Sequence, residues 1–87
     1  MTLSFPNPSR SYDSPRHRIR FWGHDSAMEV AFFVTEDALK RVEPSTRLDE
    51  EGLLGTFDAN RTAVYAAAVR VYSRGRKGSY ELAVADF

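Results

Sequence analysis

Basic and aromatic side chains alternate along one short stretch, and this is the strongest chemical signal in the chain. Arg16, Arg18, Arg20 and Trp22 are each separated by a single residue. Side chains two apart in a β-strand point to the same face, so all four would share one face. Guanidinium groups bind phosphates in bidentate fashion, and an aromatic ring beside them can stack on a base. The stretch therefore predicts either a solvated strand face or a surface for an anionic partner.

A protein-binding surface is a second interpretation of the same face. The expected sheet adds small residues and one further large ring, Phe33, to this face, and small residues beside large aromatics usually mark an interaction site. Since two-fold dimers are the commonest assembly, the candidate partners are a second copy of the chain or another protein. The candidate interaction surface comprises Arg16, Arg18, Arg20, Trp22 and Phe33, with Ala27, Ala31, Ala83 and Ala85 as its small residues.

A polar pair, Asn60-Arg61, lies inside a helical pattern at the edge of its apolar stripe. The long aliphatic stem of Arg61 can pass the core and carry the charge to an acid such as Glu81 or Asp86. Asn60 can bond the backbone of a loop. We expect a structural role for this pair, in holding down the N-terminal loop, with ligand binding as the alternative.

The chain carries no recognisable catalytic or metal-binding motif. Its two histidines, His17 and His24, together with Asp25 supply too few ligands for a filled metal site. The nucleophile elbow, the phosphate-binding loop, the dinucleotide fingerprint and the zinc-protease motif are all absent. We therefore expect no catalytic residue, no cofactor and no metal, and a protein that acts by binding and is not an enzyme.

Composition narrows the class of protein further. The 87 residues are 43% hydrophobic and 28% charged, which suits one small domain over residues 1–87. The absence of cysteine excludes disulfides and fits a reducing cytoplasm. The first ten residues lack the apolar region of a signal peptide, and no apolar run approaches the roughly 20 residues of a membrane span. A cytoplasmic protein without membrane contact is the expectation.

Charge is balanced overall but unevenly distributed. Residues 1–24 carry four arginines and one aspartate, residues 25–60 carry three basic and nine acidic residues, and residues 61–78 carry five basic residues and no acid. Two basic segments thus flank an acidic one. If segments 16–20 and 70–77 meet in space, they would form a patch for nucleic acid, and the alternative function is a nucleic-acid-binding transcriptional regulator. The zero net charge argues against a strong general nucleic-acid binder.

Two strands, Arg16–Trp22 and Ala27–Val34, are expected to form a hairpin around a turn centred on His24-Asp25. That turn would place Arg20 opposite Glu29, an opposite-charge pair on the outer face. The inner face would pair Phe21 with Met28, Ile19 with Val30 and His17 with Phe32.

Two helices are expected after the hairpin. Thr35 reads as the N-cap of a short helix over Glu36–Val42, which Pro44 ends. Thr46 or Asp49 would cap the second helix, whose apolar residues recur at helical spacing through Leu53–Tyr72. Gly75 would end this long helix.

A last strand is expected around Tyr80–Val84, and a short one around Leu3–Phe5. Strands followed by helices favour an α+β fold. The expected fold is a small, mainly antiparallel sheet with one short and one long helix packed on one face.

The sequence also resembles a bacterial family catalogued only as a domain of unknown function, number 1488 in that series. The residues that carry the resemblance are Phe5-Pro6-Asn7, Tyr12-Asp13, Phe57-x-x-Asn60-Arg61 and the terminal Ala85-Asp86-Phe87. The resemblance implies a stand-alone bacterial cytoplasmic protein of α+β fold. The family supplies no catalytic residues. Some of its members carry a transcriptional-regulator label, which gives weak support to a regulatory function.

Overall fold

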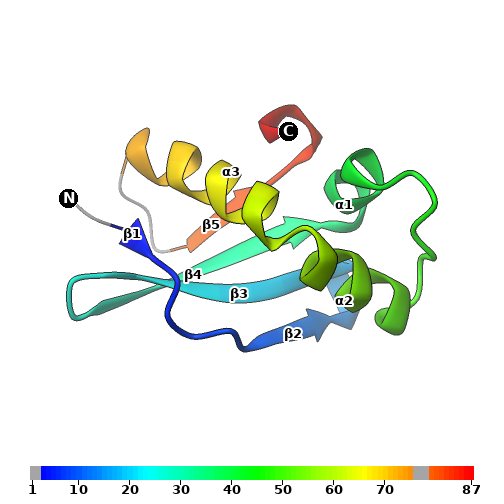
Figure 1. Cartoon of the computed structure of the whole chain (residues 1–87), viewed down its shortest axis with the longest axis horizontal. Coiled ribbons are helices and arrows are strands. Elements are labelled where there is room, and N and C mark those ends of the chain that lie inside the picture. Colours follow the sequence, from blue (N-terminus) through cyan, green and yellow to red (C-terminus); the bar gives the residue numbers. More distant parts are fainter. Residues whose placement is uncertain (1–2, 76–78) are drawn as a thin grey trace.

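The computed structural model describes residues 3–75 and 79–87, and it confirms the α+β class. Five strands form one sheet, with β3 (Arg18–Asp25) and β4 (Met28–Thr35) at its centre. The N-terminal segment supplies two short strands, β1 (Leu3–Ser4) and β2 (Arg10–Asp13), which both pair antiparallel with β3. The last strand, β5 (Ser79–Leu82), lies on the other side, next to β4 (Figure 1).

The hairpin forms, but its predicted register is wrong. The turn falls at Ser26-Ala27, where Ser26 has a left-handed φ of 57°. Phe21 therefore lies opposite Phe32, and Arg20 lies opposite Phe33 and not opposite Glu29. Because the partner of each residue moves along the strand by an even number of positions, every side chain keeps its face. The core assignment therefore survives, except at the strand ends, where Met28 is 49% exposed.

The predicted start of the strand at Arg16 is wrong, because β3 begins only at Arg18. Ser14–Arg16 forms a 3-10 helix, and His17 caps it with a left-handed φ of 50°. Arg16 therefore lies outside the strand, and the His17 side chain is 65% exposed, not in the core. Pro15 explains the difference, because its ring fixes φ and suits the start of a helical turn.

Helix α1 spans Glu36–Val42 as predicted, and the Thr35 hydroxyl accepts a hydrogen bond from the Ala38 amide. The expected long helix is instead two helices, α2 (Glu50–Ala59) and α3 (Arg61–Ser73). Asp49 caps α2. The break falls at Asn60, whose φ of −124° and ψ of 26° are not helical. The apolar stripe continues across the break, so periodicity alone could not reveal it.

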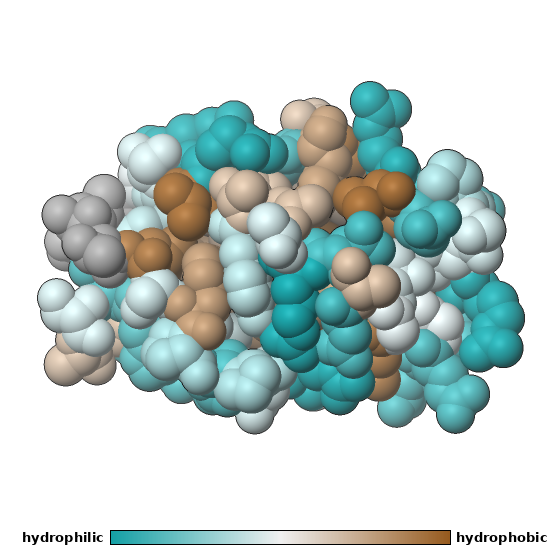
Figure 2. All heavy atoms as spheres, viewed as in Figure 1, coloured by the Kyte–Doolittle hydropathy of each residue, from teal (hydrophilic) through white to brown (hydrophobic). Residues whose placement is uncertain are grey.

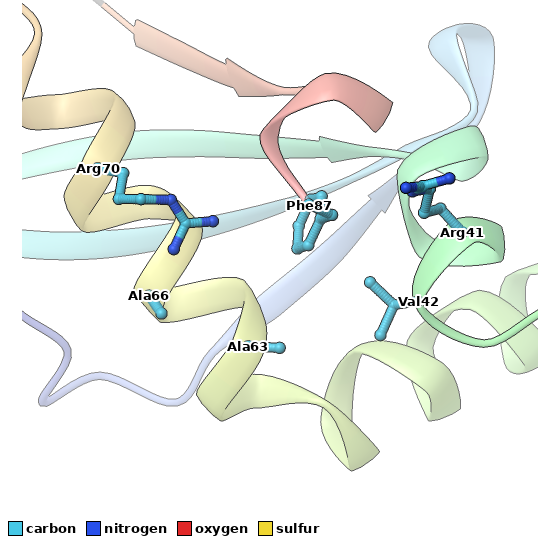
Figure 3. Close-up of a pocket in the computed structure, with 6 residues that line it drawn as sticks. All are labelled: Arg41, Val42, Ala63, Ala66, Arg70 and Phe87. Atoms are coloured by element: carbon cyan, nitrogen blue, oxygen red, sulfur yellow. The ribbon is translucent and has the colours of Figure 1, made fainter.

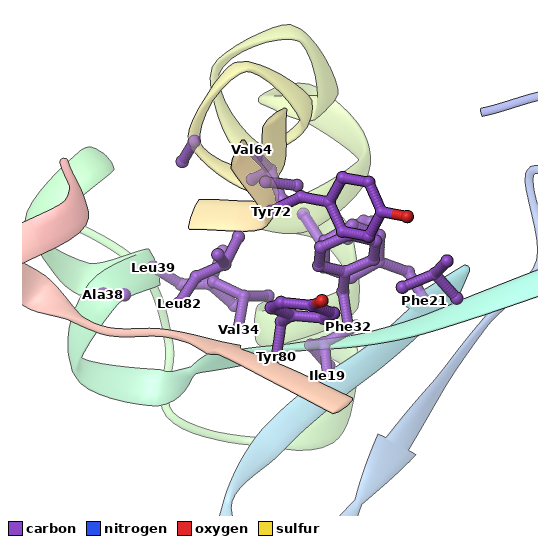
Figure 4. Packing of buried hydrophobic residues seen from close by; sticks show 14 of the residues in the cluster. Ile19, Phe21, Phe32, Val34, Ala38, Leu39, Val64, Tyr72, Tyr80 and Leu82 are labelled. Atoms are coloured by element: carbon purple, nitrogen blue, oxygen red, sulfur yellow. The ribbon is translucent and has the colours of Figure 1, made fainter. Parts of the chain in front are cut away.

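The core lies between the helices and one face of the sheet (Figure 4). Phe21 and Phe32 stack at 5.4 Å between ring centroids, and Phe57 of α2 meets Phe21 edge-on at 5.1 Å. The remaining core residues are fully or nearly fully buried as well: Ile19, Val30, Val34, Ala38, Leu39, Leu53, Val64, Ala67, Ala68, Tyr72, Tyr80 and Leu82.

The final strand runs parallel to β4, which makes the sheet mixed although mainly antiparallel. Tyr80 and Leu82 face the core, whereas Val84 lies in a 3-10 turn, η2 (Val84–Asp86), and is 40% exposed. The parallel orientation follows from the connection, because α3 carries the chain back across the sheet before β5 begins.

Candidate functional site

The sheet face away from the helices carries Arg18, Arg20, Trp22 and Phe33 of the predicted interaction surface, whereas Arg16 lies in the 3-10 helix before β3. Strand alternation sends Arg18, Arg20 and Trp22 to this face, because the intervening Ile19 and Phe21 are buried under the helices. The register places Phe33 opposite Arg20 and Ala31 opposite Trp22. We call Arg20, Trp22, Ala31 and Phe33 the central cluster of the open face.

Arg18 forms ion pairs with residues of two other strands on this face, β2 and β5. Its Nε donates to Asp13 Oδ2 of β2 at 2.8 Å, and its Nη1 donates to Glu81 Oε2 of β5 at 2.8 Å. Its guanidinium carbon also lies 3.6 Å from the centre of the Phe33 ring. The hydrogen bond to Asp13 raises the pKa of the Arg18 guanidinium. The charge of Arg18 is thus neutralised by two carboxylates. Its side chain is 14% exposed and links β2 to β5.

Arg20 has a different environment on the same face. Its guanidinium carbon lies 5.2 Å from the Trp22 ring centre and 5.8 Å from the Phe33 ring centre. Among the described residues, no carboxylate forms an ion pair with it. Such cation–π contacts at an exposed site contribute about 0.5–1 kcal/mol, so the charge remains available to another molecule.

Acidic residues border the central cluster. Glu29 is 54% exposed, and its Oε2 lies 3.9 Å from His24 Nε2. Glu81 lies opposite Phe33 on β5, and Asp13 lies beyond Arg18 on β2. Of the described basic groups on this face, Arg20 alone has no acidic partner, so the face is mixed in charge and not uniformly basic.

The polar pair Asn60-Arg61 lies across the molecule, at the helix break. Arg61 Nη2 donates to the Pro8 carbonyl and to Asp58 Oδ1, each at 2.8 Å, and its Nη1 donates to the Tyr65 hydroxyl at 2.6 Å. The expected partners Glu81 and Asp86 were wrong. The side-chain amide of Asn60 donates to the Thr56 carbonyl one turn earlier, not to a loop.

Asp58 connects Arg61 to a second arginine from the N-terminal segment. Arg10 donates from Nε to Oδ1 at 3.1 Å and from Nη2 to Oδ2 at 2.8 Å. The hydrogen bond from Arg10 lowers the pKa of the Asp58 carboxyl, and the bond from Arg61 adds to this effect. The Arg10–Asp58–Arg61 group fixes residues 8–10 to α2 and α3, which is a structural arrangement.

The two basic segments do not share a face in the described part of the chain. Arg18 and Arg20 point away from the helices, whereas Arg70 and Arg74 belong to α3, which covers the opposite face. Arg70 Nη2 donates to the Asp86 carbonyl at 2.6 Å, and Arg74 pairs with the Asp86 carboxylate at 3.2 Å. Residues 76 and 77 of the predicted patch lie outside the described residues.

The described residues contain no group of three or more histidine, aspartate or glutamate side chains that could hold a metal ion. No helix among them is long and apolar enough to cross a membrane. Sequence reasoning missed Asp58 as the partner of Arg10 and Glu81 as the partner of Arg18, since these pairs are 48 and 63 residues apart along the chain. It also missed Asp13, which lies 5 residues before Arg18 on the neighbouring strand β2.

These features define a small α+β domain with a helix-covered face and an open, mixed-charge face. A family model described as "Protein of unknown function (DUF1488)" matches residues 3–84, and the chain belongs to this family. No curated protein matches. The crystal structure of a DUF1488-family protein of unknown function from Shewanella loihica PV-4 shares the fold, with a TM-score of 0.80, 15% sequence identity and 94% of each chain covered.

Proposed function

We propose that this protein is a binding module whose open sheet face associates with a second copy of the chain. The observation that supports the proposal is the central cluster, where an arginine without an acidic partner lies beside two large rings. Trp22 and Phe33 are only half-buried within one copy. Aromatic residues and arginine are the types enriched at the energetic centres of protein interfaces.

Self-association is favoured because the face carries complementary charges at symmetric positions. Arg20 comes two residues before Trp22, and Glu29 comes two residues before Ala31, the residue opposite Trp22. A two-fold axis between two facing copies, passing over the Trp22–Ala31 pair, can bring Arg20 of each copy to Glu29 of the other. Trp22 would then lie near the axis, at the centre of the interface, from which water is excluded.

Sedimentation equilibrium at micromolar concentrations tests this proposal. We expect a dimer whose Kd rises at least about tenfold in Trp22→Ala or Arg20→Ala, since a central contact contributes more than about 1.4 kcal/mol. Val69→Ala is the matched control, because Val69 is an exposed apolar residue on α3, on the helix side. A wild-type protein that remains monomeric throughout, or a dimer that neither variant weakens, would refute the proposal.

Nucleic acid is the weaker candidate for the same face. Arg18 is occupied by two carboxylates, and Glu29 and Glu81 would lie close to a bound phosphate chain. Fluorescence anisotropy with single-stranded DNA and RNA at low salt separates the two functions, because binding to phosphates weakens steeply as salt is added. We expect no binding, and salt-sensitive binding that Arg20→Ala removes would favour this second function.

A further inference from the structure

A groove with apolar walls and two arginines lies on the helix side, where α1, α3 and the end of the described chain meet (Figure 3). Its volume is about 470 Å³, which falls in the range of small-ligand sites. Figure 2 shows brown, apolar atoms at the surface in this region, among hydrophilic ones. The lining residues are Arg41, Val42, Ala63, Ala66, Arg70 and Phe87.

The walls of the groove are built from small and aromatic side chains. Ala63 and Ala66 are exposed on α3, and their methyl groups leave room that larger residues would fill. Phe87 is half-buried and packs against the core, so its position is fixed from beneath. Figure 3 shows Phe87 between Arg70 on one side and Arg41 with Val42 on the other. A hydrocarbon or aromatic group can be held here by apolar contact.

The two arginines give the groove its charge preference. Arg41 lies in the last turn of α1 and makes no hydrogen bond or ion pair within residues 3–75 and 79–87. Arg70 donates to the Asp86 carbonyl, which holds it beside the groove without neutralising its charge. Of the acids that adjoin lining residues in the sequence, Asp86 is bound by Arg74 and by the Ala83 amide, and Glu43 accepts a hydrogen bond from Ser45. The charged side chains that line the groove are both basic.

From these contacts we propose that the groove binds a small amphipathic carboxylate, with the hydrocarbon body against Ala63, Ala66 and Phe87 and the carboxylate at Arg41. Guanidinium is the group best suited to a carboxylate, because its paired N–H donors match the two oxygens. This site lies on the opposite side of the molecule from the central cluster, so ligand binding and self-association are separate activities of one domain.

Isothermal titration calorimetry with octanoate, octanol and acetate tests the proposal. We expect octanoate to bind measurably and the other two to bind at least about fivefold more weakly, since each lacks one of the two required parts. Arg41→Ala should weaken octanoate binding by a similar factor. Ala66→Leu should abolish it by filling the groove, at an exposed position where the larger side chain does not disturb the core.

Lys40→Ala is the matched control, because Lys40 is an exposed cation on the same helix that does not line the groove. Binding should be unchanged in this variant. Equal affinity for octanol and octanoate, equal loss in Lys40→Ala and Arg41→Ala, or unaltered binding in Ala66→Leu would each overturn the proposal. Backbone amide shifts on α3 and at Phe87 in the presence of octanoate locate the binding independently of these variants.

Discussion

Asp58 connects the N-terminal segment to the helices through two arginines. It accepts hydrogen bonds from two arginines, one on the segment and one on α3. Its carboxyl has a lowered pKa in the folded protein, so the charged form stabilises the fold. This stabilisation is complete above the unfolded pKa of about 3.9 and is lost as pH falls through the lower folded pKa.

Asp58→Asn should therefore destabilise the protein at neutral pH and have less effect in acid. The side chain is 40% exposed, so water screens the ion pairs and the difference should be about 1 kcal/mol or less. Urea unfolding at several pH values measures it. We expect a constant deficit above about pH 5 that shrinks below about pH 4. Asp37→Asn is the control, because Asp37 makes no hydrogen bond or ion pair with the described residues. A deficit for Asp58→Asn that persists at low pH would contradict the charge-based explanation.

At the scale of elements, the ends of the first helix could be predicted from the sequence, whereas the hairpin turn and the pairing of the last strand could not. The bounds of α1 were readable because Thr35 supplies a cap and Pro44 stops the helix, both within the segment itself. The hairpin register was not, because His24-Asp25 looks like a turn but continues β3, while Ser26-Ala27 carries no glycine to mark the real turn. The parallel pairing of β5 depends on contacts that are remote in sequence. The same limit hid Asp58 as the partner of Arg10 and Glu81 as the partner of Arg18.

The two glycines of α2 provide a matched test of helix packing. A methyl group on Gly52 would come within 2.3 Å of the Arg47 carbonyl oxygen, which belongs to the backbone and cannot move freely. A methyl group on Gly55 would meet nothing within 4 Å. Gly52→Ala should therefore destabilise the protein by about 1–3 kcal/mol, as overpacking does.

Gly55→Ala should instead stabilise the protein by up to about 1 kcal/mol, because alanine is the better helix former. Thermal and urea unfolding of both variants provide the comparison. If Gly52→Ala stabilises the protein as Gly55→Ala is expected to do, the close approach of residue 47 to α2 does not constrain the helix.

At the scale of the whole molecule, Arg18 joins parts of the chain that lie far apart in sequence. From β3 it reaches Asp13 on β2 and Glu81 on β5, and it crosses the Phe33 ring on β4. The Arg18 side chain thus connects β2 and β3 to the last strand, β5, across the open face. Arg20, two residues along the same strand and on the same face, contacts aromatic rings but has no carboxylate partner among the described residues, and it is proposed to act between copies.

Arg18→Ala should therefore loosen both flanking strands at once. Loss of the guanidinium removes two charge-assisted hydrogen bonds and leaves Asp13, whose side chain is 24% exposed, without its partner. Amide hydrogen exchange in β2 and β5 should become about tenfold faster, whereas the core amides of β3 and β4 should change less. Arg20→Ala, measured below the Kd for self-association, should leave exchange unchanged. If Arg18→Ala accelerates β2 alone, β5 is held by its buried Tyr80 and Leu82 and not by the contact with Glu81. The comparison thus assigns one arginine of the open face to folding and leaves the other for binding.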